Sequence, residues 1–137
     1  MATDTSTNAA IVSCDIVGHG ALPSHVQQLQ SIQGLNDCIR AACKGQFDQD
    51  VIWASGGDGG HVAFLDDSLR GTALGLIRDL FSWSRHTRRQ DPGQGLPEIR
   101  LRLTAHYGSV SIVEGADQRR QLVGEGINLT FGPAAVQ

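Results

Sequence analysis

Aromatic residues are scarce in this chain, at 5% of its 137 residues, and methionine occurs once. No apolar run approaches the roughly 18 residues that a helix needs to cross a bilayer, so we expect no membrane contact. Residues 1–9 are rich in Thr, Ser and Asn and lack the basic start and the apolar stretch of a signal peptide. We therefore expect a cytoplasmic protein whose residues 1–9 form a disordered N-terminal segment.

Cysteine and positive charge are also in short supply. The three cysteines, Cys14, Cys38 and Cys43, are odd in number and lack the paired spacing of zinc ligands. Reduced, mostly buried thiols in a cytosolic protein are the simplest interpretation. The net charge is −3 and the pI is near 5.9. This balance argues against sequence-independent binding to nucleic acid, so we expect no nucleic-acid partner.

The length suits one domain with a single core, which we place at residues 10–137. Apolar residues at every third or fourth position predict helices over about 24–43 and 68–88. Apolar or alternating runs predict strands at 10–14, 51–53, 61–65, 99–105, 110–113 and 121–123, with a last helix after residue 126. This order predicts an α+β fold, a ferredoxin-like mixed β-sheet with helices packed on it.

One turn carries an unusual concentration of glycine around a carboxylate. Asp58 lies within Ser55-Gly56-Gly57-Asp58-Gly59-Gly60, between two apolar runs, which is the pattern of a β-hairpin. Glycine lets an anion approach the backbone, and a carboxylate is a typical oxygen ligand for Mg²⁺ beside phosphates. The alternative is an ordinary tight turn with a solvated Asp58.

A second carboxylate, Asp15, follows the first apolar run, where a buried central strand would deliver it to a sheet end. Asp15 and Asp58 could meet across neighbouring strands. The alternative for Asp15 is a strand-end residue that caps a turn.

Four segments in order resemble the class III nucleotidyl cyclase catalytic domain. They are Asp15-Ile16-Val17-Gly18, Gly57-Asp58-Gly59, His106-Tyr107-Gly108-Ser109-Val110 and Gly124-Glu125-Gly126-Ile127-Asn128-Leu129. The family pattern reads D-(I/L)-x-G-F, then G-D-G, then H-x-G-x-V, then G-x-x-V-N-x-A-x-R. The resemblance runs from about residue 11 to residue 129, and it implies the nucleotide cyclase fold.

The resemblance also implies the chemistry. Two Mg²⁺ or Mn²⁺ ions would be held by Asp15, Asp58 and the backbone carbonyl of Ile16, and Asn128 would orient the ribose, which makes Asp15, Asp58 and Asn128 the implied catalytic residues. The substrate would be a nucleoside triphosphate. Its other contacts would include Val17, Gly18 and Gly57. Because family sites form between two protomers, the implied partner is a homodimer mate or a different cyclase domain.

The chain departs from the family at the base and at the transition state. Purine cyclases read the base with Lys four residues before the second metal Asp and often with Asp seven before the Asn; here those positions hold Ala54 and Gln121. The transition-state Arg is replaced by Gly132, and the sequence ends at Gln137, so we expect a C-terminally short version of the fold. Members without the purine readers include pyrimidine cyclases of bacterial anti-phage defence.

Two functions follow. The first is a cyclase that converts a nucleoside triphosphate to a cyclic nucleotide and pyrophosphate by two-metal catalysis, with a non-standard base preference. The second is a catalytically degenerate cyclase-homology domain that acts as a nucleotide-sensing or dimerisation module in a signalling or defence protein. Asp15, Asp58 and Asn128 favour the first, whereas Gly132 and the early end of the sequence favour the second.

Overall fold

The computed structural model describes residues 5–18, 24–47, 50–88 and 99–123 of the 137-residue chain. Its elements in order are β1 (Thr5–Ile16), α1 (His25–Ala42), β2 (Val51–Ser55), β3 (Gly59–Phe64), a 3-10 turn (Asp67–Leu69), α2 (Arg70–Arg88), β4 (Leu101–Glu114) and β5 (Arg120–Val123). Within these ranges, no helix is long and apolar enough to cross a membrane.

The strands form one sheet in the order β2-β3-β1-β4-β5. Every neighbouring pair of these strands is antiparallel, so the expected α+β, ferredoxin-like class is confirmed but the sheet is not mixed. The reason is the path of the chain through α1. This crossover skips one position, and β3 fills the space between the parallel strands β1 and β2.

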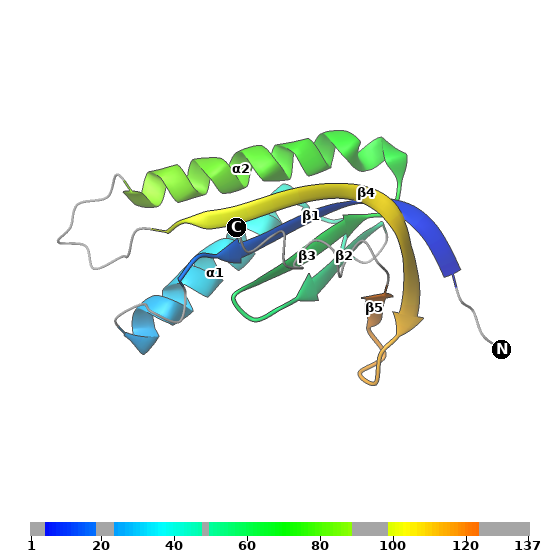
Figure 1. Ribbon diagram of the computed structural model, residues 1–137, viewed down its shortest axis with the longest axis horizontal. Helices are drawn as coiled ribbons and strands as arrows, with labels where there is room; N and C mark the ends of the chain where they lie inside the picture. The colour runs from blue at the N-terminus through cyan, green and yellow to red at the C-terminus, as the bar shows by residue number, and fades with distance from the viewer. Residues whose placement is uncertain (1–4, 19–23, 48–49, 89–98, 124–137) are drawn as a thin grey trace.

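Both helices cover the same face of the sheet (Figure 1). Alternate residues of β1, Val12, Cys14 and Ile16, are buried against them. The helices contribute buried apolar side chains to the same core: Leu35, Ile39, Ala73, Leu76 and Leu80. Because side chains alternate along a strand, Ser13 and Asp15 lie on the opposite face, beside a smaller apolar cluster of Ala9, Ile11, Ala63 and Val110.

The longest feature of the sheet is the ladder between β1 and β4, in which Thr5 pairs with Ile112 and Ile16 pairs with Leu101. This ladder corrects two expectations. Residues 5–9, expected to be disordered, form the first part of β1, and the two strands expected at 99–105 and 110–113 are one strand of 14 residues. The backbone N–H and C=O groups of β1 and β4 find their hydrogen-bond partners in each other. The composition of neither segment reveals this pairing.

The sheet bends so that its two edges approach each other. Figure 1 shows β4 curving strongly before the chain turns into β5. One guanidinium nitrogen of Arg120 in β5 donates to the carbonyl of Phe47 at 3.0 Å and lies 3.4 Å from the carbonyl of Val51 in β2. The face opposite the helices is therefore concave, with the β4–β5 hairpin held over β2.

Candidate active site

The chain brings the two predicted carboxylates to one end of the concave face. Asp15 pairs in register with Gly59, and the amide of Ile16 donates a 3.0 Å hydrogen bond to the carbonyl oxygen of Asp58. The hairpin turn is closed by a 2.7 Å bond from the amide of Gly56 to the carbonyl of Gly59. Gly57 has φ of 90°, a conformation that favours glycine. The backbone therefore holds Asp58 next to the end of β1.

Gly59 has a separate reason to be glycine. A Cβ atom added there would lie 2.5 Å from the Cα of Asp15 and would also collide with the carbonyl oxygen of Cys14. The hairpin approaches β1 too closely for any side chain at this position. This close approach accounts for the glycine directly after Asp58, which a turn alone does not require.

The Asp15 carboxylate is mostly buried, with its side chain 20% exposed, and its Oδ1 lies 3.4 Å from Nε of Arg102. The same Oδ1 has no hydrogen-bond partner among the described residues, so the contact with Arg102 is an ion pair without hydrogen-bond alignment. Burial raises the pKa of Asp15, Arg102 lowers it, and the charge of Asp58 raises it. A buried carboxylate oxygen that has no hydrogen-bond partner favours binding of a further cation.

The backbone after Asp15 turns away from the sheet. Ile16 is buried, and Val17 is 45% exposed while its amide donates to the carbonyl of Arg100 at 2.9 Å. Gly18 has φ of 69°, and no other atom lies within 4 Å of the position that its Cβ would take. The backbone that follows Asp15 is therefore not covered by a side chain at Gly18. These three residues are among those that the resemblance assigns to the nucleotide. Asn128, the remaining catalytic assignment, lies outside the described residues.

A cavity of about 500 Å³ lies between β2 and the β4–β5 hairpin. It is lined by Trp53, Ala54, Ser55, Asp117, Arg119, Arg120, Gln121 and Leu122. The two positions that the resemblance assigns to base reading, Ala54 and Gln121, thus share one hollow although 66 residues separate them in sequence. Neither strand reveals this proximity alone, because the bend of β4 creates it.

Sequence reasoning missed Arg102 and set aside His61. Arg102 lies on the polar face of an alternating strand, and only the β1–β4 register shows that it is opposite Asp15. His61 is buried on the same concave face, where its Nδ1 lies 2.6 Å from Oγ of Ser13, and burial lowers its pKa. The His61–Ser13 pair lies two residues from the Asp15–Gly59 pair in the β1–β3 ladder, on the same face of the sheet.

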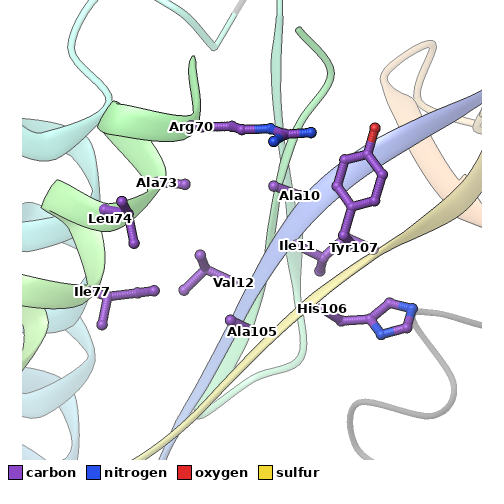
Figure 2. A pocket seen from close by; sticks show the side chains of 10 residues that line it. All are labelled: Ala10, Ile11, Val12, Arg70, Ala73, Leu74, Ile77, Ala105, His106 and Tyr107. Atoms are coloured by element: carbon purple, nitrogen blue, oxygen red, sulfur yellow. The ribbon is translucent and has the colours of Figure 1, made fainter. Parts of the chain in front are cut away.

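The segment that resembles H-x-G-x-V lies elsewhere. A Cβ atom at Gly108 would meet Nε2 of His106 at 2.6 Å, so the glycine leaves room for the imidazole ring. Tyr107 lines an open groove of about 490 Å³ between α2 and strands β1 and β4, with Arg70 stacked over its ring at 5.1 Å (Figure 2). In this part of β4 the resemblance reflects strand packing rather than contact with the carboxylates.

No group of three or more His, Cys, Asp or Glu side chains that could hold a metal occurs in the part of the chain that the structure describes. Two carboxylates and a backbone carbonyl nevertheless suit Mg²⁺, which is commonly held by one or two protein carboxylates together with water and substrate phosphates. The buried Oδ1 of Asp15, which has no hydrogen-bond partner among the described residues, fits such an ion. The residues present are therefore compatible with the predicted ions.

Comparison with solved structures shows the fold. The guanylyl cyclase Cya2 is 17% identical with a TM-score of 0.68, over 93% of this chain and 69% of that chain. The adenylyl cyclase CyaB from P. aeruginosa is 18% identical with a TM-score of 0.66, over 93% and 71%. A bacterial light-regulated adenylyl cyclase has a TM-score of 0.75 at 15% identity. The alignment covers 94% of this chain but only 39% of that chain.

The chain therefore has the fold of class III nucleotidyl cyclase catalytic domains. No protein-family model matches the sequence, and no curated protein matches it.

Proposed function

We propose that this chain is a nucleotide cyclase-type domain that converts a nucleoside triphosphate to a cyclic nucleotide and pyrophosphate, as a homodimer or with another cyclase domain. The observation that carries the proposal is the adjacency of Asp15 and Asp58, since the Ile16–Asp58 hydrogen bond joins their backbones and a buried oxygen of Asp15 has no hydrogen-bond partner among the described residues. Neighbouring acidic groups of which one has a pKa raised mainly by burial are typical of a functional site.

Asp15, Asp58 and the carbonyl of Ile16 would hold the divalent ions. When bound there, Mg²⁺ or Mn²⁺ would supply positive charge that favours ionisation of the 3′-hydroxyl and stabilises the departing pyrophosphate. In the reaction a bond forms between the 3′-oxygen and the α-phosphorus, and the bond from that phosphorus to the β-phosphate oxygen breaks. The hydroxyl proton passes to solvent.

Arg102 has the charge and the position to contact the triphosphate. Its side chain is one third exposed, and its Nε lies 3.4 Å from Oδ1 of Asp15. A cation bound at Asp15 would remove the reason for that ion pair, and the phosphates would offer Arg102 a bidentate partner. Asp15 and Arg102 would then act as a pair that attracts opposite parts of a metal–nucleotide complex.

The cavity that contains Ala54 and Gln121 would take the base, in keeping with the resemblance. Neither residue reproduces the Lys and Asp of purine cyclases, so the base preference is non-standard. The chain also lacks the transition-state Arg, since Gly132 stands in its place. Arg120 does not replace it, because its guanidinium is bound to carbonyl groups of residues 47 and 51.

The test is turnover with each of the four ribonucleoside triphosphates, in Mn²⁺ and in Mg²⁺, with products identified by mass spectrometry. We expect a cyclic nucleotide that disappears in Asp15→Asn and in Asp58→Asn. Asp79→Asn, which changes an exposed carboxylate on α2, serves as the matched control and should keep activity. Nucleotide binding without any product would instead favour the degenerate sensing or dimerisation module, and absence of both binding and product would contradict nucleotide chemistry altogether.

A further inference from the structure

We infer that the groove beside α2 is an interaction surface that fits an acidic, amphipathic α-helix of another polypeptide. The groove lies between α2 and strands β1 and β4, on the face of the sheet that the helices cover (Figure 2). It is therefore separate from the concave face that carries Asp15, and the inference does not depend on the proposed function.

The floor of the groove is apolar. Val12 of β1 and Ala73 of α2 are buried there, and Ile77 is half-buried against the same core. Ala105 and Tyr107 of β4 line the opposite side, and both are exposed. A partner that covered this groove would remove apolar surface from water along both the helix and the strand.

The groove is open rather than enclosed. Leu74 is 64% exposed and Tyr107 is 49% exposed, so a small molecule bound there would stay in contact with water, whereas a small-molecule site buries most of its ligand. Phe81, two turns after Leu74 on the same side of α2, is 50% exposed and extends the apolar surface past the groove. From Leu74 to Phe81 the helix rises about 10 Å, and a partner helix uses apolar anchors over this kind of span.

The border of this apolar surface is basic. Arg70 and Arg78 lie four residues before and after Leu74, and Arg85 lies four residues after Phe81, so each arginine is the neighbour of an exposed apolar side chain on α2. All three arginines are exposed. Among the described residues, Arg78 and Arg85 have no ion-pair partner.

The acidic residues of the same region do not cancel this charge. Asp67 lies 3.6 Å from Arg70, but both side chains are largely exposed, and such a pair contributes little. Asp79 of α2 is close enough to Cys38 of α1 for its charge to add to the effect of burial in raising the pKa of that thiol, which places Asp79 on the side of α1. The border is therefore positive, and an acidic partner complements it.

Two other occupants fit less well. A second copy of this chain offers no acidic helix among the described residues, because α1 carries only Asp37, paired with Arg40 at 2.9 Å, and α2 would bring its own arginines. An anionic membrane would attract the arginines but would repel a chain whose net charge is −3. A helix with glutamate or aspartate beside an apolar stripe matches both the floor and the border.

The experiment uses a synthetic peptide as the probe. Its leucines recur at every third or fourth position and its other positions are glutamate and alanine, which gives an acidic amphipathic helix. Binding to the full chain is measured by fluorescence anisotropy of the labelled peptide. One control peptide has the same composition in scrambled order, and another has lysine in place of glutamate.

The protein variants separate the apolar surface from the charged border. We expect Leu74→Ser and Phe81→Ser each to weaken binding of the acidic peptide by about tenfold, because each removes an apolar contact. Leu29→Ser, which changes an exposed leucine on α1, is the matched control and should bind as the wild type does. All three positions are exposed, so the variants should remain folded.

The combined Arg78→Gln and Arg85→Gln variant should weaken binding by about threefold or more, and this loss should shrink at high salt. Arg40→Gln, which changes an exposed arginine on α1, is its control. Failure of the acidic peptide to bind, equal binding of either control peptide, or unchanged binding in Phe81→Ser would overturn the inference.

Two further measurements test the other occupants. Self-association of the chain in analytical ultracentrifugation that Phe81→Ser abolishes would assign the surface to a second copy and overturn the inference. Co-sedimentation with phosphatidylglycerol vesicles that Phe81→Ser abolishes would assign it to a membrane, with the same consequence. We expect neither, because the charges of the chain oppose both.

Discussion

The amide of Ile16 donates a 3.0 Å hydrogen bond to the carbonyl of Asp58, and this bond joins the two carboxylate-bearing segments of the site. It continues the β1–β3 ladder by one step beyond the Asp15–Gly59 pair. The separation of the Asp15 and Asp58 backbones is therefore set by strand pairing. A site built on paired strands is more rigid than one built on loops.

Gly59→Ala should disrupt this arrangement. The added Cβ would meet backbone atoms of Cys14 and Asp15, which cannot move without breaking the ladder. We expect a loss of about 2 kcal/mol or more in the free energy of unfolding, by overpacking, measured by urea denaturation. Gly56→Ala is the matched control in the same turn, since its nearest heavy atom would be the Gly59 carbonyl oxygen at 3.6 Å. A Gly59→Ala protein as stable as Gly56→Ala would show that the hairpin does not approach β1 this closely.

Arg102→Gln should strengthen metal binding in the absence of nucleotide. The substitution removes a positive charge 3.4 Å from the Asp15 carboxylate, which otherwise repels an incoming cation and competes for the same oxygen. We expect Mn²⁺ affinity, measured by isothermal titration, to rise by about threefold or more, and the gain to shrink at high salt. Affinity for a nucleoside triphosphate should fall in the same variant.

The control for that experiment is Arg78→Gln, which removes an exposed charge on α2. Unchanged or weaker Mn²⁺ binding in Arg102→Gln would mean that Asp15 does not hold the ion.

Thr87→Val should destabilise the junction between α2 and the entry to β4. The Thr87 hydroxyl accepts the Ile99 amide at 3.1 Å and donates to the Ser84 carbonyl at 2.7 Å, while the Ser84 hydroxyl donates to the Ile99 carbonyl at 2.7 Å. Valine would leave the buried Ile99 amide without its partner, at a cost of about 1–3 kcal/mol. Thermal or urea unfolding measures this, with exposed Ser82→Ala as control. A loss of unfolding free energy no larger than that of Ser82→Ala would argue against the hydrogen bonds among Thr87, Ser84 and Ile99.

The native thiols should react slowly with iodoacetamide. Burial raises the pKa of Cys14 to about 12 and those of Cys38 and Cys43 to about 11. Since the thiolate is the nucleophile, a raised pKa keeps these groups protonated and inert at about pH 8, and reactivity should increase as the pH approaches the pKa. Mass spectrometry of alkylated protein checks this, with urea-denatured protein as the reference in which all three react. Rapid native labelling at about pH 8 would contradict the burial of these cysteines.

Local pattern was sufficient for the elements and for the two carboxylates. Helical periodicity located α1 and α2, and the glycine-rich run around Asp58 located the β2–β3 hairpin, because these signals depend on neighbours a few residues away. The Ser24 side chain caps α1 as the sequence indicates, accepting the Gln27 amide at 3.1 Å. Asp66 caps the 3-10 turn that leads into α2, with its side chain accepting the Ser68 amide at 3.0 Å.

Local sequence patterns did not predict which distant strands pair with each other. Residues 5–9 look disordered by composition, and they become a strand only because residues 108–112 of β4 supply their partners. The ion pair of Arg102 with Asp15 depends on the same register, and a shift of one residue would place Arg102 on the other face of the sheet.

By itself, then, the sequence determined which residues are the candidates for the chemistry: two carboxylates, glycine around one of them, and altered residues at the positions that the resemblance assigns to the base. The tertiary structure alone decided how they combine. The bend of β4 places Gln121 beside Ala54 and aligns Arg119 with their cavity, and the β1–β4 register places Arg102 against Asp15. Sheet curvature and register arise from the sum of many weak cross-strand contacts, so no single stretch of sequence encodes them.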